Sequence, residues 1–223
     1  MYFEILRFEW RYYSHQTLFL VAAILFLVLG FLGTMGNFGG LDVQVNSPFV
    51  VTYFLALLSL KSIFVVTIFC AHGVLRDKSN RMEEIVYSSA IDRFPFLASR
   101  FTGLFLASWS ILICAGIGMP FGSLISDSSK LGAFQLRTYL EPLIVFCAPN
   151  ILFSCAVCFT IAILTRSVAA TYVGGVLLYA LYFVGSILGN SPLLAGSTAT
   201  GPEGELLPIL LDPYGFVAFF DQA

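Results

Sequence analysis

The feature that most constrains this chain is a series of five long apolar segments, interrupted by only one formal charge, Lys61. A membrane-spanning helix needs about 20 apolar residues, and each segment provides that length. Charged residues make up 11% of the chain, whereas soluble domains have about 25%. The sequence therefore predicts an all-α, polytopic helical membrane protein. Its five spans are expected at about 17–35, 50–75, 101–125, 143–165 and 168–188.

The Lys and Arg residues outside these segments predict the orientation, because cytoplasmic loops carry an excess of both. If the N-terminus is inside, the inner segments hold eight of these cations and the outer segments hold two, Lys130 and Arg137. We therefore expect a multi-pass protein of the plasma membrane with a cytoplasmic N-terminus. No disulfide framework is expected, because all five cysteines lie within the apolar segments or at their ends.

Residues 1–16 are predicted to form an amphipathic helix that lies in the inner membrane interface. Aromatic residues on one side and cations on the other suit such a helix. Its apolar face, at helical spacing, is expected to consist of Phe3, Leu6, Trp10 and Tyr13. Its polar face is expected to hold Glu4, Arg7, Arg11 and His15. The alternative is a ragged extension of the first span.

The segment 76–100 is the only sizeable polar segment on the inner side. Asn80 suits the cap of a short helix, with Glu83 three residues later closing a capping box. Asp92 suits the cap of a second short helix that leads into the third span. A short helix with an exposed apolar stripe predicts a docking element, and a solvated connector is the alternative. The candidate contact residues are Arg81, Met82, Glu83, Glu84, Ile85 and Val86.

Lys61 lies near the middle of the second apolar segment, about 16 Å of helix from either end. A lysine at the bilayer centre costs roughly 2.5–3.5 kcal/mol on insertion scales. We therefore expect its side chain to face the bundle interior, a water-filled cavity or a partner subunit. Three interpretations stay open: a role in a substrate path, a packing face, and a bent segment that does not span directly.

Glycine and proline spacing predicts how the later spans pack. Gly118-x-x-x-Gly122 and Gly185-x-x-x-Gly189 have the spacing that permits close helix approach. Pro120 is expected to kink or break its helix, and so is Pro149.

Motifs for catalysis are missing from the sequence. It contains no G-x-x-x-x-G-K-[ST] loop, no H-E-x-x-H motif and no serine in a nucleophile elbow. We therefore expect a protein that is not itself an enzyme, without a metal site or a cofactor of its own, and with no nucleic-acid partner. The lipid bilayer is its expected environment.

The order of these parts resembles the membrane subunit of ABC transporters of the type-2 exporter class. HGVLRDKSNRMEEIVYSSAIDRFPFLASRFTGLFLA (72–107) is similar to the inner loop of that class. NSPFVVTYFLALLSL (46–60), APNILFSCAVCFTIAILTRSVAATYVGG (148–175) and LLDPYGF (210–216) resemble more closely one branch. In that branch the permease is fused to a zinc aminopeptidase-like domain of the gluzincin type. The resemblance covers nearly the whole chain. Such units usually have six spans, however, and the resemblance does not explain the charge of Lys61.

The resemblance implies a transport component that moves an unspecified substrate. A separate P-loop ATPase on the cytoplasmic side would bind ATP and Mg²⁺, with the loop helix at about 80–89 in a groove on its surface. Two permease units would pair, and Lys61 is a candidate for the substrate path. The chain would comprise the interfacial helix 1–16, a bundle at 17–188 with the coupling loop 76–100, and an outer segment 189–223 that begins a missing sixth-span region. On this view the chain is an N-terminal fragment.

Two other functions remain as alternatives. In the first alternative, the bundle is a membrane anchor or scaffold for a peptidase domain encoded downstream. In the second it is a secondary carrier driven by an ion gradient, with Lys61 lining the path. A carrier of that kind is expected to have several ionisable groups within its spans, and these segments contain one formal charge.

Overall fold

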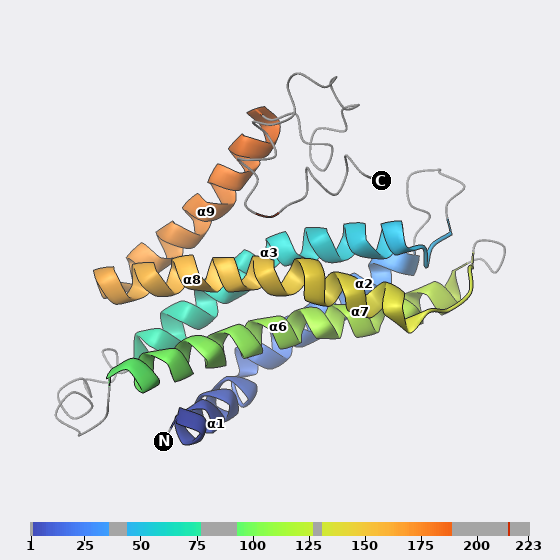
Figure 1. Ribbon diagram of the computed structural model, residues 1–223. Helices are drawn as coiled ribbons and strands as arrows, with labels where there is room; N and C mark the ends of the chain where they lie inside the picture. Colours follow the sequence, from blue (N-terminus) through green and yellow to red (C-terminus); the bar gives the residue numbers. More distant parts are fainter. Residues whose placement is uncertain (1, 36–43, 77–92, 127–130, 189–213, 215–223) are drawn as a thin grey trace.

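The computed structural model describes residues 2–35, 44–76, 93–126, 131–188 and 214 (Figure 1). Nearly all of these described residues are helical, and no strand occurs among them. The helices in chain order are α1 (Tyr2–Ser14), α2 (Thr17–Met35), α3 (Pro48–Val74), α6 (Arg93–Ile125), α7 (Leu136–Pro142), the π-helix η2 (Leu143–Cys147), α8 (Ala148–Thr165) and α9 (Val168–Leu188). The predicted all-α fold is confirmed.

Four helical stretches are long and apolar enough to cross a membrane: Thr17–Met35, Pro48–Val74, Phe94–Ile125 and Leu136–Thr165. The fifth, α9, is apolar over the shorter range Val168–Val184. The protein is therefore a polytopic helical membrane protein, as the hydropathy of the sequence predicted. The predicted bounds of the first and fifth segments coincide with those of α2 and α9.

The third and fourth spans begin earlier than predicted. Helix α6 starts at Arg93, so the short helix expected after Asp92 and the third span form one continuous helix. The fourth stretch starts at Leu136 and passes through α7 and η2 into α8. The polar residues at both starts hid this continuity, because hydropathy alone does not distinguish a loop from a helix that extends beyond the bilayer.

The prolines act differently from one another. Helix α6 continues through Pro120 to Ile125, so this proline does not break the helix. Pro149 lies in the first turn of α8, directly after the π-helical turn at Leu143–Cys147. A proline removes one hydrogen bond from the helical ladder, and a widened turn at this point accommodates the change in register. At the start of α3, Pro48 follows Ser47, whose Oγ accepts a hydrogen bond from the Val50 N–H at 3.3 Å.

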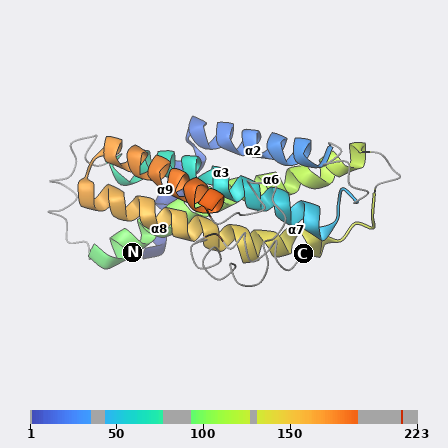
Figure 2. The ribbon, with the colours of Figure 1, turned by 90° about the horizontal axis from the view of Figure 1, so that it is seen from above.

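Helices α2, α3, α6 and α8 lie side by side along the length of the bundle, and α3 is the most buried of the spans (Figures 1 and 2). Its fully buried side chains, including Leu55 and Phe69, join those of α6 and α8, such as Ile111 and Ile151, in one apolar core. Helix α9 starts beside the end of α8 and diverges from it (Figure 1).

Glycines hold α2 close against α6. A Cβ atom on Gly118 would overlap the Leu27 carbonyl oxygen, and one on Gly122 would overlap that of Phe31. The Thr34 hydroxyl donates a hydrogen bond to the Met119 carbonyl at 2.7 Å across this contact. The close approach predicted from Gly118-x-x-x-Gly122 is confirmed. The second motif ends at Gly189, outside the described residues.

Helix α1 packs against α6 with a buried face that includes Glu9 and Tyr13. Phe3 is 79% exposed and Trp10 is 40% exposed, whereas Glu9 and Tyr13 are buried. The predicted apolar face is thus divided, with Tyr13 packed inside the protein and Phe3 and Trp10 on its surface. Glu9 is buried where Arg76, after α3, and Arg100 of α6 contact its carboxylate. Phe3 and Trp10 are then free to contact lipid at the membrane surface.

Candidate functional site

The predicted coupling residues lie outside the part of the chain that the structure describes. They are Arg81, Met82, Glu83, Glu84, Ile85 and Val86. The described residues do include both ends of that loop, Arg76 after α3 and the start of α6 at Arg93. What the structure adds is the environment of these two ends.

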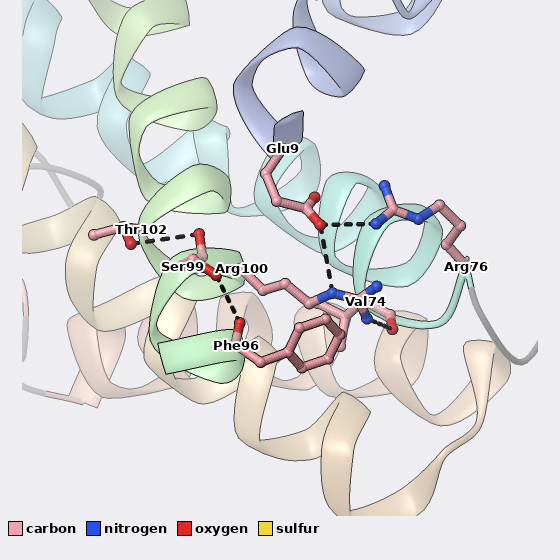
Figure 3. A network of polar contacts seen from close by, with 7 residues as sticks. All are labelled: Glu9, Val74, Arg76, Phe96, Ser99, Arg100 and Thr102. Carbon is pink, nitrogen blue, oxygen red and sulfur yellow. Dashed lines mark hydrogen bonds and ion pairs between the residues drawn. The ribbon is translucent and has the colours of Figure 1, made fainter. Parts of the chain in front are cut away.

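A buried carboxylate connects α1 to both ends of the loop (Figure 3). Glu9 is 1% exposed. Arg76 donates a hydrogen bond from Nη2 to Glu9 Oε1 at 2.7 Å. The Arg100 Nε lies 3.4 Å from the same oxygen. We call Glu9, Arg76 and Arg100 the ionic cluster, and it joins three separate helical segments through one oxygen atom.

Aromatic rings and a carbonyl group complete the environment of the two arginines. The Arg76 guanidinium lies 4.3 Å from the ring centre of Tyr12, and that of Arg100 lies 4.5 Å from the ring of Phe96. Cations over ring faces are stabilised by the ring quadrupole. Arg100 also donates a hydrogen bond from Nη1 to the Val74 carbonyl at 3.2 Å, which ties the start of α6 to the end of α3 (Figure 3).

Tyr13 lies one helical turn beyond Glu9, between two glycines. A Cβ atom on Gly73 of α3 would overlap the Tyr13 hydroxyl, and one on Gly103 of α6 would come within 2.8 Å of the Glu9 Cβ. Burial, reinforced by the Glu9 carboxylate, raises the pKa of the Tyr13 phenol well above its ordinary value. Tyr13 is therefore neutral near pH 7, and its side chain packs between α3 and α6 next to the ionic cluster.

The residues of the ionic cluster hold helices together. The cluster has no nucleophile beside a base, and no group of three metal-ligating side chains occurs among the described residues. A buried ion pair costs roughly 3–5 kcal/mol to break by removal of one partner. The cluster is thus suited to hold α1, α3 and α6 together under load at the base of the loop.

The sequence-based prediction missed the ionic cluster. Its signal was present: Glu9 and Tyr13 are four residues apart and so share a helix face, and a charge on that face needs a partner. Arg76 and Arg100 were counted only as loop cations for the orientation. Their pairing with Glu9 joins residues 67 and 91 positions apart in sequence, which helical periodicity does not predict.

Lys61 lies in the middle of α3 and is exposed. It therefore does not face the interior of the described bundle, which leaves a water-filled cavity or a partner as the expected environments. No hydrogen bond or ion pair joins it to any residue in the described ranges. The neighbouring ring of Phe64 contacts Tyr179 of α9, with 4.9 Å between the ring centres.

Small polar side chains connect α3 to α8 inside the core. Asn150 donates a hydrogen bond from Nδ2 to Ser59 Oγ at 3.2 Å, and the Ser154 hydroxyl lies 3.1 Å from that of Tyr214. The Asn150–Ser59 bond links α8 to α3, and the Ser154–Tyr214 contact links α8 to the later part of the chain.

A pocket of about 310 Å³ lies at the opposite end of the bundle from the ionic cluster. The start of α3, α7 and η2 form its walls, which include Thr52, Thr138 and Val145. The acid at the pocket, Glu141, is 2.9 Å from the Nε atom of Arg137.

Comparison of the chain with protein-family models, with curated proteins and with solved structures found no match.

Proposed function

We propose that this chain is the membrane (permease) subunit of an ATP-binding cassette transporter. It moves a substrate across the bilayer with energy from a separate P-loop ATPase subunit, which binds ATP and Mg²⁺ on the cytoplasmic side. The chain itself supplies spans and a docking loop and no catalytic group. A second permease unit pairs with it to complete the path.

The observation that supports this proposal is the ionic cluster at the base of the loop. The segment 77–92 connects α3 to α6, and one carboxylate of α1 contacts Arg76 just before this segment and Arg100 about two turns into α6. A displacement of the loop would therefore move the bases of three helices together. A loop that served only to link two spans needs no such buried connection.

Packing explains how the movement would reach the far side of the membrane. Helix α6 contacts α2 through Gly118 and Gly122 at backbone distance, and close-packed helices transmit strain because interiors have few voids. Force on the base of α6 would then be carried along its full length and into α2. In this mechanism the ionic cluster links α1 to the spans, and the loop residues contact the ATPase.

The test uses the full-length chain, purified in mild detergent from membranes of the cell that produces it. We expect vanadate-sensitive ATP hydrolysis to copurify with it. The double variant Ile85→Asp/Val86→Asp should lose at least about tenfold of this activity per mole of chain, because two buried charges are inserted into the predicted interface. Equal amounts of carbonate-resistant protein in the membrane fraction would show that insertion is intact.

The matched control is Leu41→Asp/Val43→Asp, which makes the same chemical change in the predicted outer segment. It should retain the copurifying ATPase activity. Undiminished activity in the loop variant would overturn the docking role. A wild-type chain that carries a peptidase and no ATPase would overturn the transporter and favour the scaffold instead.

A further inference from the structure

The exposed lysine of α3 lies on a narrow stripe of that otherwise buried helix. Lys61 shares this stripe with Leu57, Phe64 and Ile68, which are only partly covered by the described helices. Phe64 meets Tyr179 of α9 at one edge of the stripe. At the other edge Phe54 packs against α2, where a Cβ atom on Gly33 would lie 2.9 Å from its ring. The stripe is therefore bounded on two sides by other spans.

Among the described residues, no acidic side chain pairs with Lys61. The acids in the described ranges are Glu4, Glu9 and Glu141, and they lie in α1 and α7, away from the centre of α3. A second copy that met this stripe across a two-fold axis would bring two Lys61 ammonium groups together, and like charges repel. The group that would neutralise the charge of Lys61 is therefore an anion.

The surroundings of the ammonium group decide what kind of anion is suitable. The neighbouring side chains are aliphatic and aromatic, and a small hydrated anion would lose its water there without replacement hydrogen bonds. An anionic group attached to an apolar body satisfies both parts of the stripe. Its head would pair with Lys61, and its body would contact Leu57, Phe64 and Ile68.

We propose that Lys61 and the stripe around it form a binding site for a single-chain amphipathic anion, an apolar body that carries a carboxylate, sulfate or phosphate. The identification of this molecule as the transported substrate rests on the proposed function. The binding itself does not, because it needs only α3 and its neighbours.

The experiment uses the full-length protein in nanodiscs of neutral phosphatidylcholine and a dodecanoate probe with a terminal diazirine, at alkaline pH where the carboxylate is ionised. After illumination, mass spectrometry locates the label. We expect labelled peptides from α3 or α9, with competition by unlabelled dodecanoate and none by dodecyltrimethylammonium. Lys61→Met should reduce labelling about tenfold or more, which corresponds to about 1.4 kcal/mol of binding free energy.

Two further variants separate charge from folding. Lys61→Arg keeps the charge and should retain most of the labelling. Lys130→Met removes one lysine in the predicted outer segment, the same change in net charge, and should label as the wild type does. Equal labelling of Lys61→Met and wild type, or equal competition by the cationic amphiphile, would overturn the site.

The source of the anion and the transport role are tested separately. If phosphatidylglycerol in the disc suppresses labelling as strongly as dodecanoate does, the occupant is a membrane lipid, and the proposal of a single-chain anion is wrong. The Ile85→Asp/Val86→Asp variant should label normally, because the site lies within the spans. Loss of its ATPase activity with intact labelling would support both proposals, whereas normal ATPase activity with intact labelling would overturn the docking role alone.

Discussion

Replacement of Glu9 by glutamine is the most informative perturbation of the ionic cluster. The side chain keeps its size and its Oε1 acceptor, so the change isolates the charge. In the wild type, one carboxylate neutralises part of the charge of Arg76 and Arg100, at 2.7 and 3.4 Å. In Glu9→Gln the two guanidinium groups lose the carboxylate charge of Glu9.

The magnitude follows from burial. The side chains of Glu9, Arg76 and Arg100 are 2%, 13% and 8% exposed, so solvent screens their interaction weakly. Removal of one partner from a buried pair costs roughly 3–5 kcal/mol. Because glutamine still accepts a hydrogen bond from Arg76, we expect the lower end, about 3 kcal/mol of unfolding free energy.

Tryptophan fluorescence provides the assay, because Trp10 lies on α1 next to the cluster and its ring contacts Phe19 of α2, with 6.4 Å between ring centres. In a Trp109→Phe background, Trp10 reports the release of α1 during denaturation in detergent. The matched control is Glu4→Gln, which makes the same change at an exposed position of the same helix and should shift the free energy by less than about 0.5 kcal/mol.

A double variant tests whether charge is the cause. Arg76→Gln added to Glu9→Gln restores the net charge of the cluster to one cation, so it should recover part of the lost stability. The reasoning is refuted if Glu9→Gln behaves like Glu4→Gln, or if the double variant loses the sum of both single effects, since coupled residues do not add.

Two further predictions concern packing and pH. Gly122→Val should destabilise the bundle by about 1–3 kcal/mol, because its side chain would overlap the Phe31 carbonyl oxygen. Thermal unfolding measures the effect, and Ile117→Val, at an exposed position of α6, is the control. Equal melting temperatures of the two variants would contradict the expected overlap. Because the folded pKa of Tyr13 is raised above its ordinary value of 10.0, its contribution to stability is fully present below that pH and is lost as pH rises from 10.0 towards the folded pKa. Tyr13→Phe should reduce this alkaline loss in a pH series of unfolding curves, and an unchanged alkaline slope would contradict the assignment.

The outcome at individual residues shows which inferences a sequence permits. Gly118 and Gly122 were predicted to permit close approach because their spacing is a local property, and α2 does approach there. Phe3, Trp10 and Tyr13 were placed together on the apolar face of α1, and the structure buries Tyr13 beside Glu9 while it leaves Phe3 and Trp10 exposed. Periodicity alone does not predict that division. Periodicity also could not predict which helix packs against Gly118.

The same distinction between local pattern and tertiary packing applies to the candidate site. The position of Lys61 near the middle of a span and the cost of its charge follow from counting residues. Its exposure on a stripe between α2 and α9 depends on how three helices cross, and no local pattern contains that information. The loop residues Arg81 to Val86 lie outside the described residues, so the docking role stays a prediction.

The sequence by itself determined that this protein lies in a membrane, because the apolar segments have the length and hydropathy that a bilayer requires. It also determined the bounds of α2 and α9, where the transition from polar to apolar residues is abrupt. Only the tertiary structure decided that Glu9 is buried and joins Arg76 to Arg100, and that Lys61 is left on an exposed face. The physical reason is that hydropathy acts residue by residue, whereas an ion pair or an exposed face exists only once distant segments have packed together.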